Sequence, residues 1–247
     1  MSHVVWLDGG LVDPATAALP ITDPGVRWGD GLFETMRAEH GRVPNIDRHL
    51  ARLSASIRTL QLDPIPADDD IRRAVDAVVA QLDNGPHRLR VTVTTRPTLL
   101  VEATPYEPAG PDHGAAAISM RGAWWPGDEL HEHKTLSYAG HRLAHRRAAA
   151  AGGDAALLLD DAGRLGEADA ANVLVVTGEA IATPPVEGIL GGVTRDVIIE
   201  QCQAAGIPIE VRHIPEAEWR AADEVLLTNG LAGVTSVTSV DGAPVGT

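Results

Sequence analysis

The sequence predicts an α+β protein made of two domains. Its first half mixes short strands with two helices, whereas its second half is rich in strands that two further helices interrupt. Between the halves lies Pro105–Gly114, where three prolines and two glycines disfavour both helix and strand. A mixed domain followed by a strand-rich one favours the α+β class over regular βαβ alternation. We therefore expect an N-terminal α+β domain at residues 1–113 and a C-terminal β-rich domain at residues 114–247.

The first half opens with two strands, Val4–Leu7 and Gly10–Val12, around the turn at Asp8–Gly9. A glycine-rich segment, Gly25–Gly31, follows. The first helix is expected at Asp47–Leu60, because its apolar residues fall on one stripe at helical spacing. These residues are Leu50, Leu53, Ile57 and Leu60.

A second helix is expected at Asp68–Leu82, where Ile71, Val75 and Val78 belong to one apolar face. A turn at residues 84–86 (Asn-Gly-Pro) ends it. In Arg88–Thr95 apolar and polar residues alternate, which predicts a half-buried strand.

In the second half, glycines mark the ends of the two predicted helices. The helices are expected at Leu143–Ala151 and Thr194–Ala205. Strands are expected at Ala115–Met120, Ala156–Asp160, Asn172–Thr177, Ile209–His213 and Glu224–Thr228.

The overall charge and composition exclude several classes of protein. A net charge of −14 argues against nucleic-acid binding, which rewards basic surfaces. Apolar stretches are too short to span a membrane, and the N-terminus does not resemble a signal peptide. The single cysteine, Cys202, excludes an internal disulfide and fits a reducing compartment. We therefore expect a soluble, cytoplasmic globular protein.

Lys134 is the only lysine, so the Lys+Arg total of 20 leaves 19 arginines. An arginine serves surface charge as well as a lysine does, but it stays protonated. A lysine amine can lose its proton when buried and then form a Schiff base with a carbonyl substrate or with pyridoxal phosphate (PLP). Lys134 is therefore a candidate catalytic residue, although compositional drift also explains a solitary lysine.

Three other segments have both a structural and a functional interpretation. Gly188–Arg195 places glycines before a predicted helix, as in a phosphate-binding turn or an ordinary capped helix start. Arg52 suits phosphate, but its position off the apolar stripe predicts a solvated side chain. Glu167 can hold a pyridinium nitrogen protonated, or it can be a turn glutamate.

His141 and His145 lie one helical turn apart, a spacing that zinc ligands share. The sequence offers no evident third ligand and no HExxH pattern. We therefore predict no metal site.

Taken together, six motifs in order resemble those of the fold-type IV PLP enzymes. This family includes branched-chain aminotransferases, D-amino acid aminotransferases and 4-amino-4-deoxychorismate lyase. The lysine segment, Lys134–Tyr138, stands third among the six motifs, so the sole lysine occupies the family's lysine position. The other motifs are Gly29–Glu34 (GDGLFE), His49–Leu53 (HLARL), Glu167 with Asn172–Val173, Gly192–Arg195 (GVTR) and Glu224–Asn229 (EVLLTN).

The resemblance implies a role for each matching residue. Lys134 would hold PLP, Glu167 would meet the pyridine nitrogen, and Arg52 would bind the phosphate. It also implies two domains with the cofactor between them, in a homodimer whose sites borrow a neighbour's loop. The remaining expected cofactor residues are Val193, Thr194 and Asn229, and the expected substrate residues are Phe33, Arg96, Tyr138 and Asn229.

Three segments of the sequence bear on which reaction of the family the protein catalyses. Thr228–Gly233 (TNGLAG) resembles the lyase pattern, with Asn229 near the substrate. In D-amino acid aminotransferases a tyrosine, an arginine and a histidine trap the substrate carboxylate, whereas the positions here read Phe33, Arg96 and Thr98. We therefore expect 4-amino-4-deoxychorismate lyase activity first, a class IV aminotransferase second, and a non-catalytic PLP-binding dimer as the alternative of another class.

Overall fold

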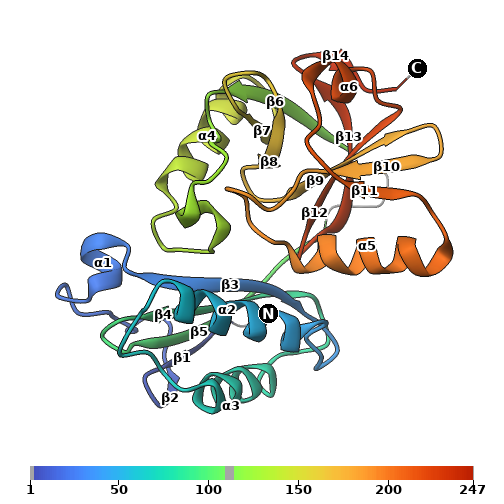
Figure 1. Cartoon of the computed structure of the whole chain (residues 1–247). Coiled ribbons are helices and arrows are strands. Elements are labelled where there is room, and N and C mark those ends of the chain that lie inside the picture. The colour runs from blue at the N-terminus through green and yellow to red at the C-terminus, as the bar shows by residue number, and fades with distance from the viewer. Residues whose placement is uncertain (1–2, 109–113, 247) are drawn as a thin grey trace. The chain divides into compact units, whose positions relative to one another are not determined.

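The protein is described by a computed structural model that covers residues 3–108 and 114–246. The described chain forms two compact units (Figure 1). Unit 1 holds the described residues up to Pro108 together with Lys134–Tyr138, and unit 2 holds residues 114–133 and 139–246. Half of the expected linker Pro105–Gly114, residues 109–113, lies outside the described residues, so the division at residues 113 and 114 stays a prediction. Lys134, expected in the second domain, belongs to unit 1.

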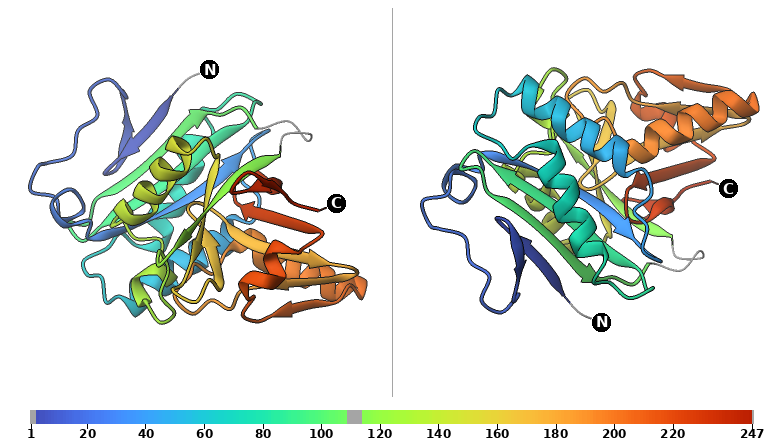
Figure 2. Two further views of the ribbon diagram at one scale, coloured as in Figure 1. Left: turned by 90° about the horizontal axis from the view of Figure 1, so that it is seen from above. Right: turned by 90° about the horizontal axis from the view of Figure 1, so that it is seen from below.

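Unit 1 is an antiparallel sheet of five strands, in the order β2-β1-β5-β4-β3, with helices α2 and α3 on one face (Figure 2). Its apolar core lies between this face and the two helices. The elements of unit 1 are β1 (Val4–Leu7), β2 (Gly10–Val12), α1 (Pro24–Trp28), β3 (Gly31–Ala38), α2 (Ile46–Thr59), α3 (Asp68–Val79), β4 (His87–Thr94) and β5 (Leu99–Pro105).

The alternation predicted for the strand near residue 90 is confirmed in β4. Leu89, Val91 and Val93 are fully buried in the core, while the intervening positions point to the other face of the sheet. In α3 the acidic first turn favours the helix start through the helix dipole. The helix ends at Val79, three residues before the predicted end, and Leu82 still packs on the core from the following turn.

Strand β3 was not predicted, because the sequence drew attention only to its glycines. It forms one edge of the sheet and pairs with β4 along its whole length. The other side of β3 meets the lysine segment through a bridge between Leu32 and Thr135.

Unit 2 is built on a mixed sheet of nine strands, in the order β11-β10-β9-β12-β13-β6-β7-β8, with β14 beside β13 (Figure 1). Helix α4 packs on β6 and β7, and helix α5 packs on β11 and β12. The strands of unit 2 are β6 (Ala115–Arg121), β7 (Ala155–Leu159), β8 (Leu165–Ala168), β9 (Asn172–Thr177), β10 (Ala180–Thr183), β11 (Ile209–Val211), β12 (Glu224–Asn229), β13 (Gly233–Val240) and β14 (Ala243–Pro244). Its helices are the 3-10 helix η1 (Glu129–Glu132), α4 (Ala139–Ala150), α5 (Val193–Ala205) and α6 (Glu216–Arg220).

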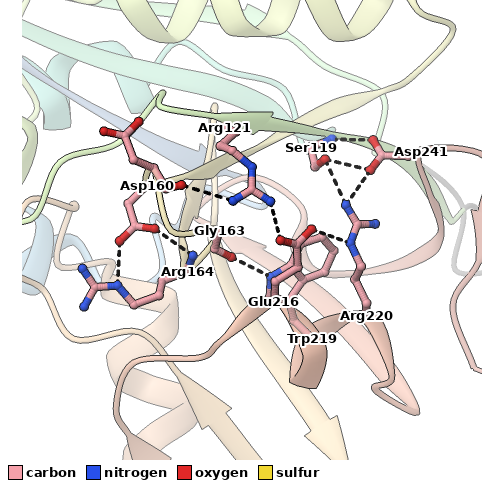
Figure 3. Close-up of polar contacts among 10 residues, drawn as sticks. Ser119, Arg121, Asp160, Gly163, Arg164, Glu216, Trp219, Arg220 and Asp241 are labelled. Carbon is pink, nitrogen blue, oxygen red and sulfur yellow. Dashed lines mark hydrogen bonds and ion pairs between the residues drawn. The ribbon is translucent and has the colours of Figure 1, made fainter.

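A polar network on unit 2 ties α6 to the sheet (Figure 3). Glu216 accepts hydrogen bonds from Arg121 of β6 and from Arg220, the latter at 2.8 Å. Asp241 accepts from Arg220 at 3.1 Å and from the Ser119 hydroxyl at 2.7 Å. Within the described chain, no helix is both long and apolar enough to cross a membrane.

Candidate active site

The lysine segment is attached to β3 by its backbone. The carbonyl of Lys134 accepts the N–H of Phe33 at 2.9 Å, and Leu136 donates its N–H to the carbonyl of Gly31 at 2.9 Å. The glycines of the GDGLFE motif make this approach possible. A Cβ atom on Gly31 would lie 2.9 Å from the Leu136 side chain, and one on Gly29 would lie 2.5 Å from the Ser137 hydroxyl. Gly29 also has a φ of +70°, which favours glycine.

The Lys134 amine lies against aromatic rings. Its Nζ is 4.4 Å from the ring centroid of Phe33 and 5.5 Å from that of Tyr138. The two rings meet edge to face, with centroids 5.3 Å apart. Unit 1 therefore brings together three of the predicted residues, Lys134, Phe33 and Tyr138.

Arg90 joins this cluster, and the sequence analysis missed it. Its guanidinium carbon lies 3.7 Å from the Phe33 ring centroid. Burial lowers the pKa of Arg90, while the charge of Glu102, its neighbour in register on β5, raises it. The alternation in β4 could have identified this position, because it places Arg90 on the face of the sheet opposite the core-facing Leu89 and Val91.

Arg96 and Thr98 are placed differently from this cluster. Arg96 is exposed in the turn between β4 and β5, where it donates to the Thr22 hydroxyl at 3.1 Å. The Thr98 hydroxyl is buried and donates to Asp23 at 2.7 Å. A role of Arg96 in substrate binding stays a prediction.

The expectation of a solvated Arg52 is wrong, since its side chain is only 17% exposed. Its Nε and one terminal nitrogen donate to the two carboxylate oxygens of Glu34 at 2.8 and 2.6 Å. Glu34 also contacts His49 Nδ1 at 2.8 Å. The apolar stripe of α2 could not reveal this position, because the partner carboxylate comes from the core-facing side of β3. Charge pairing therefore holds Arg52 beside the stripe.

Glu34 is buried, and its ionisation is set by these partners. Burial alone would raise the pKa of Glu34. The charge of Arg52 and the hydrogen bonds from His49 and Arg52 outweigh burial and lower this pKa to about 2.

In unit 2 Glu167 lies on β8 and is 5% exposed, so it is not a turn glutamate. One of its oxygens accepts the backbone N–H of Leu190 at 3.3 Å. The other lies 3.3 Å from His141 Nε2. The carboxylate is therefore held from both sides by unit 2 itself.

The two histidines of α4 each contact a carboxylate. His141 contacts Glu167, and His145 Nδ1 lies 3.0 Å from a carboxylate oxygen of Asp169. The four-residue spacing of the two histidines on α4 thus matches the two-residue spacing of Glu167, on β8, and Asp169, directly after it. In the part of the chain that the structure describes, no group of three or more candidate ligands can hold a metal ion.

The start of α5 carries the predicted phosphate-binding residues. Gly192 is the N-cap, and no described side chain caps this helix. The first amides, those of Val193 and Thr194, therefore keep the donor capacity that helix starts offer to anions. A Cβ atom on Gly192 would lie 1.8 Å from the amide oxygen of Asn172, so only glycine fits. The buried hydroxyl of Thr228, in register with Asn172, has no hydrogen-bond partner among the described residues.

Asn229 shapes the turn that follows β12. Its side-chain oxygen accepts the N–H groups of Leu231 and Ala232 at 3.0 and 2.8 Å. Its side-chain nitrogen donates to the carbonyl of Ala170 at 3.4 Å. Contact of Asn229 with a cofactor or substrate stays a prediction.

Comparisons with known proteins agree with this picture. The family model described as Amino-transferase class IV matches residues 31–240. A putative branched-chain-amino-acid aminotransferase of Methanocaldococcus jannaschii is 32% identical over 96% of this chain and 88% of its own length.

Two solved structures are similar over 98% of this chain, each with a TM-score of 0.89. A fold IV-transaminase from Curtobacterium pusillum is 28% identical, with 93% of its chain covered. The PLP-bound form of a hypothetical aminotransferase from Mycobacterium tuberculosis is 25% identical, with 92% covered. These matches confirm the predicted fold and cofactor. The chain belongs to the class IV aminotransferase family, and it is a PLP-dependent enzyme with the two-domain architecture of fold type IV.

Proposed function

We propose that this enzyme transfers the amino group of an amino acid to a keto acid. The observation that carries the proposal is the setting of Lys134, the only lysine in the chain, which is attached to β3 with its amine against two aromatic rings. When bound, PLP supplies an aldehyde for reversible carbon–nitrogen bonding to amines and a ring that withdraws electrons. Lys134 Nζ would bond to this aldehyde and, once released, carry a proton to and from the substrate carbon.

The residues present fit the rest of the cofactor. The proposed phosphate ligands are Arg52, whose guanidinium forms bidentate contacts, and the first amides of α5, Val193 and Thr194. The buried hydroxyl of Thr228, which has no hydrogen-bond partner in the described part of the chain, adds a donor on β12, the strand that α5 packs on. Glu167 is the proposed partner of the ring nitrogen, where a carboxylate keeps that nitrogen protonated.

The substrate carboxylate calls for a cation near the reacting amine. Arg90 lies against the same Phe33 ring as Lys134. A planar guanidinium suits a carboxylate, and partial burial strengthens the interaction. We assign Arg90 to the substrate carboxylate, with Phe33 and Tyr138 as the walls of the substrate site.

The lyase reaction, which gives 4-aminobenzoate and pyruvate, is the second candidate. It is favoured by the TNGLAG segment, whose turn Asn229 organises through two hydrogen bonds. Relatives in the comparisons favour amino transfer instead.

We also propose a cytoplasmic homodimer. Support for the dimer comes from the exposed apolar side chains around α1 in unit 1. Ile21, Val26 and Trp28 are 85%, 56% and 65% exposed, and they lie within eight residues of one another, so they offer apolar surface for a second copy of the chain to cover. The single cysteine, Cys202, is free and buried, which suits a reducing compartment.

Two experiments test the proposal. Borohydride reduction followed by peptide mapping should label only the peptide that contains Lys134, and label elsewhere would reject its role. Incubation with D-alanine, L-leucine and aminodeoxychorismate, each with a keto acid acceptor, separates the reactions. Amino transfer from an amino acid supports the proposal, whereas 4-aminobenzoate without amino transfer would replace it with the lyase reaction.

A further inference from the structure

We propose that His141 is a positioning residue for Glu167. In this proposal, the imidazole holds one carboxylate oxygen in place and so fixes the orientation in which Glu167 meets the cofactor ring nitrogen. The inference rests on the proposed function of Glu167 and adds a residue to it.

The contact is buried and specific. The side chains of His141 and Glu167 are 10% and 6% exposed, and Nε2 lies 3.3 Å from one carboxylate oxygen. The backbone N–H of Leu190 donates to the other oxygen. Two donors from different elements leave the carboxylate little freedom to rotate. Away from water, such hydrogen bonds are stronger and more directional.

His141 is itself held in place. It lies on α4, and its ring meets the ring of His131 edge to face, with centroids 5.1 Å apart. His131 belongs to η1 and lies 3.6 Å from a carboxylate oxygen of Asp128. The imidazole that supports Glu167 is therefore fixed by packing from η1 as well as by its own helix.

An imidazole also suits the charge that Glu167 has to keep. A neutral imidazole donates one hydrogen bond and leaves the carboxylate its negative charge. An arginine in the same place would neutralise that charge, as Arg52 does for Glu34. With His141, Glu167 stays oriented and still attracts a proton to the ring nitrogen.

The neighbouring pair on α4 provides a matched control. His145 contacts Asp169 at 3.0 Å, on the same helix and one turn later. The proposed site does not include Asp169. Removal of His145 therefore measures how much a histidine–carboxylate contact contributes to the stability of α4, apart from any effect on Glu167.

The experiment measures PLP affinity, the visible spectrum of bound PLP and the melting temperature of the apo protein in four variants. H141L removes the donor, H141Q keeps a side-chain N–H at about the reach of Nε2, H145L is the matched control, and E167Q tests Glu167 itself. H141L should weaken PLP binding about 10-fold, as expected for the loss of a hydrogen bond to a charged group. It should also shift the visible band. H141Q and H145L should bind PLP within about threefold of the wild type, since both keep a donor on Glu167.

Three results would overturn the inference. The first is wild-type PLP affinity and spectrum in H141L while E167Q changes both, which leaves the proposed function intact. The second is an equal change in H145L, which would make the effect one of α4 stability. The third is no change in E167Q, and that result would also remove Glu167 from the proposed function. If H141L does not fold, an H141Q variant that loses the wild-type spectrum counts against the inference.

Discussion

Two buried glutamates, one in each unit, differ in how their charge is balanced. Glu34 in unit 1 accepts hydrogen bonds from Nε and one terminal nitrogen of Arg52 and contacts His49, at 2.6 to 2.8 Å. Glu167 in unit 2 has an imidazole and a backbone amide, each at 3.3 Å. Neither side chain is more than 6% exposed. Burial alone therefore does not distinguish them.

The difference determines whether each carboxylate has charge left to interact with a ligand. Glu34 has a full countercharge, and it orders Arg52 and His49 on α2. Among the described residues, Glu167 has two hydrogen-bond donors but no bidentate cation, which leaves its charge available to a further proton donor. We infer that Glu34 maintains the architecture of a binding arginine, whereas Glu167 acts on the ligand.

The largest effect is expected from Glu34→Ala. This change leaves Arg52 buried without its countercharge, and breaking a buried pair in this way costs about 3–5 kcal/mol. Urea unfolding of the apo protein measures the loss. Arg52→Ala in the same assay should also destabilise unit 1, because it leaves Glu34 unpaired. A loss below about 1 kcal/mol in both variants would show that the pair is not structural.

A pH dependence follows from the pKa of Glu34, which is lowered from 4.5 to about 2. A lowered folded-state pKa contributes stability above the unfolded-state value, and this stability is lost as pH falls from about 4.5 towards 2. A shift of this size corresponds to about 3 kcal/mol. Unfolding of apo wild type and Glu34→Gln between pH 7 and 2.5 should converge as acid removes the wild-type advantage. If the free energies of unfolding of the two proteins changed in parallel with pH, Glu34 would not be the group whose protonation causes the loss of stability.

Glu167→Gln should affect turnover strongly and stability little, whereas the main effect of Glu34→Ala is on stability. The amide keeps the size and most hydrogen bonds, so the free energy of unfolding should change by less than about 1 kcal/mol. The turnover rate should fall about 100-fold, equivalent to about 2.7 kcal/mol, because the amide carries no charge to hold the ring nitrogen protonated. Steady-state kinetics with the best amino acid donor checks this. A rate within threefold of the wild type would remove the distinction between the two glutamates.

The comparison also explains what the sequence could and could not predict. Periodicity located α2 and β4, because their apolar residues face one core. It assigned Arg52 to solvent, since a stripe reports apolar packing and cannot anticipate a carboxylate on another strand. Motif order indicated the proposed role of Lys134. It did not predict the contacts of Arg90 with Phe33 or of His141 with Glu167. The partners in each contact lie far apart along the chain and meet only after folding.

The smallest effect is expected where a carboxylate has two cationic partners at the surface. Glu216 lies between Arg121 and Arg220 (Figure 3), as Glu34 lies between Arg52 and His49, but the side chains of Glu216 and of both arginines are partly exposed. The side chains of Arg121 and Arg220 are 49% and 39% exposed, so water and salt screen the attraction. Arg220→Ala should lower the melting temperature by no more than about 3 °C, and 0.5 M salt should remove most of the difference. Arg52→Ala under the same conditions is the buried counterpart, and its larger loss should persist in salt. Equal salt sensitivity of the two variants would show that burial does not separate the two kinds of carboxylate, and the contrast between structural and surface pairs would fail.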